Sequence, residues 1–276
     1  MIKLVASDLD GTLFNSKGQI SDYGIQFVVA TGRSYSGAQT VVDRLGLLQE
    51  GYGLICLNGL RTYHFPSLDY SQRHLLTYEN CLELEALGKH FYLGILYCFD
   101  DMIYFEMNPR DYQDYTIALD RHNLRFFKEN MATQDIADLR EIKSRFEQGD
   151  PILKVVYVQS PAFMDLILER VRQAINPLFN LSLVGSGWAE VVFKDINKGI
   201  ALREYGESLG IAADEIMAFG DAENDLEMLS SIPNGIVMAN GMDSVKAIAS
   251  AQAKSNDDDG VARYLVDYLG IDDSMD

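Results

Sequence analysis

Hydrophobic residues in the first and last parts of the chain form short continuous runs, and stretches with a helical hydrophobic period separate them. The apolar runs occupy residues 2–5, 25–30, 54–57, 216–219 and 235–238. The stretches of helical period occupy residues 34–48, 198–209, 245–248 and 261–269. Short runs that are apolar on both faces are typical of a parallel sheet covered by helices on both sides. The pattern predicts an α/β fold with a Rossmann-like open parallel sheet.

The middle of the chain follows a different order, in which a helix and two strands occur twice. The expected helices are 79–90, 109–122, 133–146 and 162–175, and the expected strands are 92–97, 102–105, 152–158, 181–184 and 190–193. Strands that follow one another without a helical crossover favour an antiparallel sheet. We therefore expect a core of residues 1–79 and 194–276, interrupted by an α+β domain at 80–193.

Composition narrows the possible partners. The chain has 276 residues and a formal net charge of −18, which disfavours an electrostatic grip on nucleic acid or an anionic membrane. The three cysteines, Cys56, Cys81 and Cys98, are an odd number without metal-ligand spacing. No signal peptide or membrane-spanning run is recognisable, so we expect a soluble cytoplasmic protein. The sequence gives no indication of the oligomeric state.

Candidate chemistry begins with two carboxylates that directly follow the first apolar run. Asp8 and Asp10 stand two residues apart, ahead of Gly11. Placed at the end of a buried strand, they would repel each other unless a cation or proton lay between them. Asp8 could then be a nucleophile, Asp10 an acid or base, and the pair part of a Mg²⁺ site. The alternative is a surface turn, because Asp-Gly is a common turn signal.

Polar residues also follow two other apolar runs directly. Thr31 comes after residues 25–30, and Asp221 comes after residues 216–219 and Gly220. Open parallel sheets bind ligands beyond the carboxyl ends of their strands, at a topological switch point. We therefore expect Asp8, Thr31 and Asp221 to reach the same edge of the sheet.

Four short motifs, in order along the chain, resemble those of the haloacid dehalogenase superfamily of phosphohydrolases. They are Asp8-Leu9-Asp10-Gly11-Thr12, Thr31-Gly32-Arg33, Lys198-Gly199 and Gly220-Asp221-Ala222-Glu223-Asn224-Asp225. The insertion at 80–193 resembles the type IIB cap of the Cof-like subfamily. The resemblance extends over the whole chain and implies a phosphohydrolase core whose cap selects the substrate.

This resemblance implies a role for each acidic residue. Asp8 would attack phosphorus and form an aspartyl-phosphate, while Asp10 would protonate the leaving group and then activate water. Mg²⁺ would be held by the Asp8 carboxylate, the Asp10 backbone carbonyl and the Asp221 carboxylate, with Asp225 supporting it through a water. In an acidic protein this cation would neutralise the phosphate locally.

The remaining motif residues would bind the phosphoryl group. Thr31 and Asn224 would donate hydrogen bonds to it, and Gly32 would let the backbone come close. Lys198 would supply a fixed positive charge. A lysine at a helix start is unfavourable by the helix dipole, so a nearby anion explains it better than a solvated side chain does.

The leading prediction is a Mg²⁺-dependent phosphohydrolase that acts on a small phosphorylated metabolite such as a sugar phosphate. Two alternatives stay open, a phosphomutase of the same superfamily and a catalytically silent protein that binds a phosphorylated metabolite. Arg33 could touch the substrate or form a structural ion pair. Asn58 could line the site or serve as a turn residue.

Two other patterns carry less weight. Gly206-Glu207-Ser208-Leu209-Gly210 matches G-x-S-x-G but lies at the end of an expected helix, not at a strand-to-helix elbow. The four histidines show no metal-ligand spacing: His64, His74, His90 and His122.

The crossover between the first two core strands is short. The resembling family has a helix just before its second strand, whereas this sequence has only residues 21–24 between Ile20 and Ile25. Either the protein lacks that helix or the printed sequence omits a segment. We favour an omission, because a missing helix would bare one face of a buried sheet.

Overall fold

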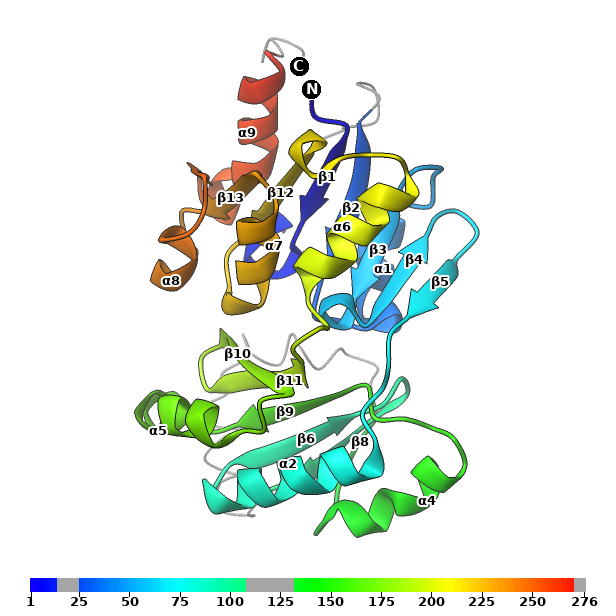
Figure 1. Ribbon diagram of the computed structural model, residues 1–276, viewed down its shortest axis with the longest axis vertical. Helices are drawn as coiled ribbons and strands as arrows, with labels where there is room; N and C mark the ends of the chain where they lie inside the picture. The colour runs from blue at the N-terminus through cyan, green and yellow to red at the C-terminus, as the bar shows by residue number, and fades with distance from the viewer. Residues whose placement is uncertain (14–24, 108–131, 271–276) are drawn as a thin grey trace. The chain divides into compact units, whose positions relative to one another are not determined.

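The computed structural model describes residues 1–13, 25–107 and 132–270. The chain divides into two compact units, one formed by Met1–Arg73 with the residues from Asp195 onward, and the other by His74–Lys194 (Figure 1). We call them the core unit and the inserted unit. The short crossover at 14–24 and the helix expected at 109–122 lie outside the described residues.

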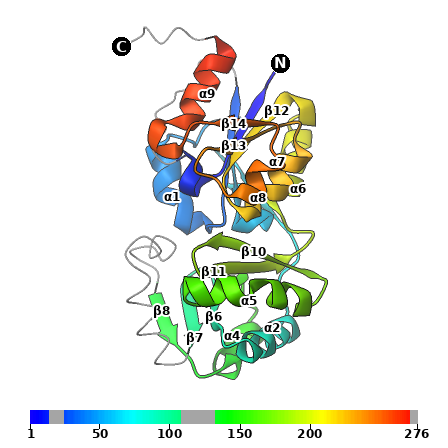
Figure 2. The ribbon, with the colours of Figure 1, turned by 90° about the vertical axis from the view of Figure 1, so that its left-hand side faces the viewer.

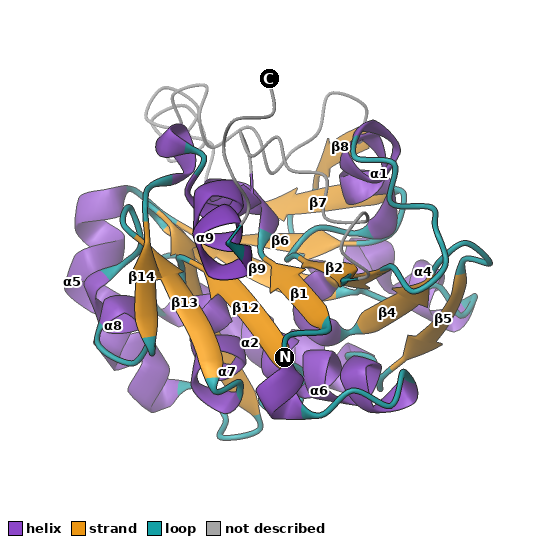
Figure 3. Cartoon of the chain, turned by 90° about the horizontal axis from the view of Figure 1, so that it is seen from above, coloured by secondary structure: helices purple, strands orange, loops and turns teal. Residues whose placement is uncertain are grey.

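The core unit is built on a sheet whose described strands follow the order β14-β13-β12-β1-β2-β3-β4-β5. All neighbours from β14 to β3 pair in parallel, which confirms the predicted Rossmann-like sheet. Figure 3 shows β13, β12 and β1 side by side. The parallel strands are β1 (Leu4–Ser7), β2 (Gln26–Ala30), β3 (Gly53–Cys56), β12 (Ile216–Gly220), β13 (Asn234–Met238) and β14 (Ala251–Ala253).

One edge of this sheet carries an antiparallel hairpin that the hydrophobic pattern does not predict. It consists of β4 (Arg61–His64) and β5 (Asp69–Gln72), with β4 paired to β3. All four residues of β5 are exposed, so the strand has no apolar run that would mark it in the sequence. The predicted parallel sheet therefore ends in two antiparallel strands.

Helices cover both faces of the core sheet, and Figure 2 shows α1 and α9 on one side and α6 and α7 on the other. The helices are α1 (Tyr35–Arg44), α6 (Lys198–Ser208), α7 (Leu226–Ser231), α8 (Asp243–Lys246) and α9 (Gly260–Leu269). Alternate residues of β1 point to opposite faces, so Leu4 and Ala6 pack with Leu202 of α6. Helix α1 is shorter than expected because Leu45 caps it and Gly46 turns away at φ +62°.

The inserted unit is an α+β module around a second sheet, with the order β10-β11-β9-β6-β7-β8 in the described residues. Pairing is antiparallel except between β7 and β8. Its main core includes Leu84, Tyr157 and Val171, which lie between this sheet and two helices. Its elements are α2 (Tyr78–His90), β6 (Gly94–Cys98), β7 (Met102–Glu106), β8 (Ala132–Asp135), α4 (Lys143–Glu147), β9 (Lys154–Val158), α5 (Pro161–Ala174), β10 (Phe179–Gly185) and β11 (Trp188–Phe193).

The expectation of one helix over residues 133–146 is wrong. The segment begins as strand β8, which pairs with β7, and continues as a 3-10 turn at Leu139–Ile142 before the short helix α4. Asp138 separates the strand from the turn, because its carboxylate accepts a hydrogen bond from the Arg140 backbone N at 2.9 Å. Such local bonds from aspartate start new turns.

Short 3-10 turns complete the connections of the core unit. They are Leu57–Gly59, Ala213–Glu215, Glu223–Asp225 and Asn256–Asp258. The three cysteines are buried free thiols. In the ranges covered by the structure, every helix is too short or too polar to cross a lipid bilayer.

Candidate active site

Three of the predicted site residues directly follow the carboxyl ends of three neighbouring parallel strands. Ser7 of β1 lies opposite Val29 of β2 and Phe219 of β12, so the three strands end at the same edge of the sheet. Asp8 follows β1 and donates its backbone N–H to the Phe219 carbonyl at 2.9 Å. Thr31 follows β2, and Asp221 follows β12. The strand order thus brings distant parts of the chain to one rim.

Lys198 joins two of the acidic groups at this rim. It is the first residue of α6, whose start is fixed by the Asn197 side chain accepting a hydrogen bond from the Ile200 backbone N at 2.9 Å. Its Nζ lies 2.6 Å from Asp8 Oδ1 and 2.7 Å from Asp225 Oδ1, and its side chain is fully buried. The alternative of a solvated lysine at a helix start is therefore wrong.

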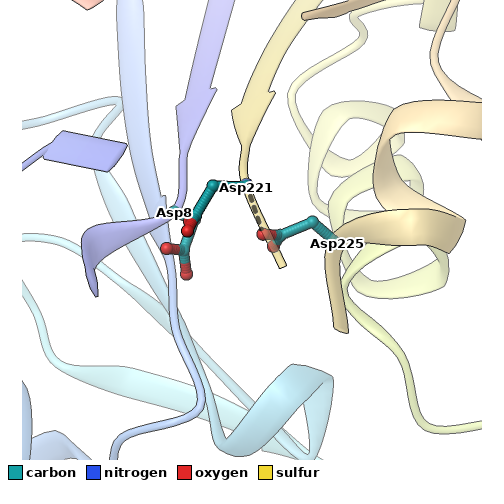
Figure 4. A group of neighbouring side chains, drawn as sticks. All are labelled: Asp8, Asp221 and Asp225. Carbon is teal, nitrogen blue, oxygen red and sulfur yellow. Dashed lines mark hydrogen bonds between the residues drawn. The ribbon is translucent and has the colours of Figure 1, made fainter. Parts of the chain in front are cut away.

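Asp221 and Asp225 are held by hydrogen bonds from their own and neighbouring loops. Thr12 Oγ1 donates to Asp221 Oδ1 at 2.8 Å. Asp225 Oδ2 accepts from the backbone N of Asp221 at 2.9 Å and of Ala222 at 3.1 Å (Figure 4). Because Asp225 Oδ1 accepts from Lys198, both of its oxygens have donors within the protein. Asp225 thus orients the Asp221 loop and the lysine together.

The close approach of the carboxylates perturbs their ionisation. Burial raises the pKa of Asp8 well above its ordinary value, and the negative charges of Asp225 and Asp221 add to the rise, while Lys198 opposes it. Burial and the neighbouring Asp225 raise the pKa of Asp221 to about 7. Burial alone would lower the pKa of Lys198, but Asp225 and Asp8 raise it. The lysine therefore stays charged, and the acids compete for protons or cations.

The acidic cluster fits a hard divalent cation. Asp8, Asp221 and Asp225 each offer a carboxylate oxygen, and these oxygens lie within 4.8 Å of one another. When all three acids are ionised, Lys198 balances one charge and leaves two negative charges. Carboxylate oxygens are the ligands that Mg²⁺ and Ca²⁺ prefer. Figure 4 shows these three aspartates in one cluster at the strand ends.

Gly11 allows the first acidic loop to approach the second. Its φ is +82°, and a Cβ at this position would lie 2.5 Å from Asp221 Oδ2. Both the left-handed backbone and the close contact exclude a larger residue. The Asp-Gly turn predicted from the sequence is thus part of the site, not an isolated surface turn.

Arg33 forms an ion pair with Asp10. Its Nε donates to Asp10 Oδ2 at 2.8 Å, and its Nη2 pairs with Oδ1. Both oxygens of Asp10 therefore face the guanidinium. Of the two roles considered for Arg33, the ion pair is the one that the structure contains.

Asn58 connects the predicted phosphate-binding residues. Its backbone N donates to the Thr31 carbonyl at 3.1 Å, and its side-chain oxygen accepts from Asn224 Nδ2 at 3.0 Å. Asn58 is buried and has φ +57°, so it is both a turn residue and a partner of a motif residue. Thr31 is also buried, and its Oγ1 accepts from the Arg33 backbone N at 3.2 Å. Gly32 lies between Thr31 and Arg33, in the bend that follows β2.

Thr12 is a site residue to which the sequence interpretation assigned no role. Its side chain is buried and fixes Asp221, which lies in another motif. A small polar residue directly after the Asp-Gly turn was the available signal. The G-x-S-x-G pattern has no nucleophile geometry, because Ser208 ends α6 and its Oγ donates to the Tyr205 carbonyl at 2.7 Å.

Fold and site together define a Rossmann-like enzyme class in which an aspartate at a strand end is paired with a buried lysine and a second acidic loop. The chain belongs to the haloacid dehalogenase-like hydrolase family, whose sequence model matches residues 5–265. This match confirms the family that the four motifs indicate.

Relatives with full-length similarity are phosphatases by name. The phosphatase YwpJ of Bacillus subtilis is 29% identical, over 97% of this chain and 100% of its own length. The 5-amino-6-(5-phospho-D-ribitylamino)uracil phosphatase YitU of the same organism is 25% identical, over 97% and 98%. Among solved structures, the haloacid dehalogenase subclass IIB sugar phosphatase BT4131 superposes with a TM-score of 0.70 and is 19% identical. The match covers 98% of this chain and 100% of that structure, so the two proteins share the fold. The predicted class of enzyme, a haloacid dehalogenase-type phosphatase, is confirmed at the level of the family.

Proposed function

We propose that this protein is a Mg²⁺-dependent phosphohydrolase that releases phosphate from a small phosphorylated metabolite through an aspartyl-phosphate on Asp8. The observation that carries the proposal is the buried contact of Lys198 with Asp8 and Asp225, beside Asp221, at the carboxyl edge of the sheet. A fixed cation next to a strand-end carboxylate suits a nucleophile that must approach an anionic phosphoryl group.

In the first step a carboxylate oxygen of Asp8 attacks phosphorus and forms the acyl-phosphate bond. The bond from phosphorus to the substrate oxygen breaks, and Asp10 gives its proton to the departing alkoxide. In the second step Asp10 takes a proton from water, and the water oxygen attacks the phosphorus and releases Asp8 and inorganic phosphate. Splitting the hydrolysis in two replaces one difficult step by two easier ones.

The side chains of Asp8 and Asp221 and the backbone carbonyl of Asp10 would hold the cation, and Asp225 would support it from outside. When bound, Mg²⁺ screens the approaching negative charges and orients the phosphoryl oxygens. Asp225 suits a supporting role because its oxygens already accept from Lys198 and from two backbone N–H groups.

Lys198, Thr31, Gly32 and Asn224 would bind the transferring phosphoryl group. The Thr31 hydroxyl and the Asn224 amide would donate to its oxygens, and the backbone at Gly32 would come close to it. In the structure Thr31 and Asn224 are linked through Asn58, which contacts both of them. This linkage supports a shared role in holding one anion.

For Asp10 to act as an acid and base, its carboxyl group must leave Arg33 when substrate binds. The ion pair is partly accessible, since the Asp10 side chain is 26% exposed, so an incoming phosphate ester could displace it. Arg33 would then be available to the anionic substrate. The role of Asp10 thus includes an exchange of partners.

The inserted residues 80–193 would serve as the cap that recognises the leaving group and excludes water. We propose a sugar phosphate or a related phosphorylated polyol as substrate, because BT4131 is described as a sugar phosphatase and YitU acts on a phosphorylated ribityl compound. The reaction needs neither nucleic acid nor a membrane, and a reducing cytoplasm suits the buried free thiols.

The test is a screen of phosphorylated metabolites for phosphate release with Mg²⁺. We expect release from a sugar phosphate, loss of release with EDTA, and no turnover by Asp8→Asn, which keeps the size of the side chain. Hydrolysis that needs no added bisphosphate would exclude the phosphomutase alternative. A folded protein that binds phosphorylated sugars but never releases phosphate would favour the silent alternative and contradict the proposal.

A further inference from the structure

The loop that follows β13 contacts both acidic loops of the site, although none of the four motifs includes it. Asn240 Nδ2 donates to the Gly11 carbonyl at 2.8 Å. Two residues later, the backbone N of Met242 donates to the Asp221 carbonyl at 2.8 Å. Gly241 lies between them, and a Cβ there would be 3.2 Å from Asp221 Cα. Residues 239–242 thus bridge the Asp8 and Asp221 loops.

The amide of Asn240 has a different partner at each end. While Nδ2 donates to Gly11, Oδ1 accepts from the Asn256 backbone N at 3.1 Å. The two bonds require an amide, with a donor on one side and an acceptor on the other. The residue is exposed, so its contribution rests on these bonds and not on packing.

The backbone of Gly11 is more flexible than that of other residues, so a hydrogen bond from outside the turn helps to hold its conformation. Glycine adopts many backbone conformations, and its left-handed φ of +82° is one of several available to it. Its carbonyl lies one peptide beyond the carbonyl of Asp10, the proposed metal ligand. Fixing the Gly11 carbonyl therefore fixes the turn that aims the Asp10 carbonyl.

We propose that Asn240 is a positioning residue that orders the Asp10-Gly11 turn for cation binding. The inference rests on the Mg²⁺ site of the proposed function. Asn240 touches neither the substrate nor the cation and acts through the Gly11 carbonyl. Asn240 fixes the position of the Asp8 loop through the Gly11 carbonyl, and the Met242 backbone N–H fixes the Asp221 loop through the Asp221 carbonyl.

The test measures Mg²⁺ binding to the purified protein by calorimetry, without substrate. Losing one such hydrogen bond should raise the Mg²⁺ dissociation constant of Asn240→Ala about fivefold. Asn240→Asp keeps the acceptor for Asn256 but cannot donate to Gly11. If only its added negative charge mattered, Asn240→Asp would bind Mg²⁺ more tightly than wild type. We expect weaker binding, because the variant has lost the hydrogen bond to Gly11.

Asn234 provides a matched control at the other end of the same strand. Its Nδ2 donates to the carbonyls of Asp214 and Ile216, both at 3.0 Å, at the amino end of β13. Asn234→Ala therefore also removes an amide that binds backbone carbonyls, but away from the acidic loops. We expect the Mg²⁺ affinity of Asn234→Ala to equal that of wild type. We also expect that, without metal, the thermal midpoint of Asn240→Ala falls no more than the thermal midpoint of Asn234→Ala.

The possible results separate this inference from the proposed function. Wild-type affinity in Asn240→Ala, or equal weakening in Asn234→Ala, would overturn the role of Asn240 while leaving the phosphohydrolase intact. A wild-type protein that binds Mg²⁺ but releases no phosphate would contradict the proposed function alone. A wild-type protein that binds no Mg²⁺ would overturn both.

Discussion

Lys198 carries a positive charge into a fully buried position, where a charge is tolerated only with well-placed partners. Asp8 and Asp225 supply those partners from two different loops. The same contacts that stabilise the lysine also hold its ammonium group beside Asp8, the proposed nucleophile. Stability and chemistry are thus coupled at this residue.

Replacing Lys198 by methionine should therefore impair both properties. Removing one partner from a buried ion pair destabilises a protein by about 3–5 kcal/mol, and turnover should be lost with the phosphate-binding charge. Urea unfolding measures the first effect, and phosphate release the second. As a control, Lys3→Met removes a lysine whose side chain is 55% exposed and paired with Glu215, so it should change stability by at most ~1 kcal/mol. Equal stability losses in the two variants would contradict this interpretation.

Gly11→Ala tests the close approach of the two acidic loops. The new Cβ would strain the backbone and displace Asp221, so we expect loss of Mg²⁺ binding and of phosphate release. Gly210→Ala is the matched control, because Gly210 also has a positive φ, +69°, but has no atom within 4 Å of the added Cβ. It should lower stability by about 1 kcal/mol and leave Mg²⁺ binding unchanged. The interpretation fails if Gly11→Ala binds Mg²⁺ as wild type does.

At the level of elements, the inserted unit contains a polar network, separate from the acidic cluster, in which a half-exposed lysine contacts buried glutamates. Lys89 of α2 pairs with Glu106 of β7 at 2.6 Å and with Glu85 at 3.0 Å. Tyr97 of β6 donates to Glu106 at 2.9 Å. Burial raises the pKa of Glu106 to about 7, with Glu85 adding to the rise while Lys89 and Tyr97 oppose it. The network joins one helix to two strands.

This network predicts a pH dependence of stability. Between about pH 4.5 and 7, folded Glu106 keeps a proton that the unfolded chain has lost, so its contribution to stability falls as pH rises through this window. Glu106→Gln stays neutral and should remove that part of the decline, which thermal unfolding at several pH values would measure. Glu147→Gln, at a glutamate whose side chain is 64% exposed, should keep the wild-type slope. Identical slopes in wild type and Glu106→Gln would exclude this role.

The elements that the sequence predicts well are those that a continuous apolar run or a helical period defines. Strands β1, β2, β3, β12 and β13 fall into this group, because both of their faces are buried. Strand β5 could not be predicted, since its four residues are exposed and its pairing comes from the edge of the finished sheet. Strand β8 is likewise exposed, and the helix expected at 133–146 overlaps its last three residues.

For the whole molecule, the sequence predicts which residues meet because parallel strands end at a common edge. Asp8, Thr31 and Asp221 could be assigned to one edge in this way, whereas Lys198 and Asp225 were assigned to the site by the resemblance of their motifs to the family. The individual contacts could not be assigned, since they depend on how loops fold back. The Arg33–Asp10 pair, the Thr12–Asp221 bond and the anchor at Asn240 are such contacts.

Metal binding should depend on pH through the same cluster. Burial and Asp225 raise the pKa of Asp221 to about 7, so a proton competes with the cation below that pH. The rise in thermal midpoint on adding Mg²⁺ should be small at about pH 5.5 and large at about pH 8, and EDTA should reverse it. Asp221→Asn should show little rise at either pH. Equal rises at both pH values in wild type would contradict competition between the proton and the cation at Asp221, and no rise at either pH would contradict the cation site.

The central claim is that Asp8 carries the phosphoryl group during turnover. The most direct measurement is a rapid acid quench of the enzyme with a phosphoryl-labelled sugar phosphate that it hydrolyses, followed by peptide mapping. We predict label on the peptide that contains Asp8 in wild type and no labelled peptide in Asp8→Asn. Label on another residue, or hydrolysis by wild type without any labelled protein in the pre-steady state, would contradict the account.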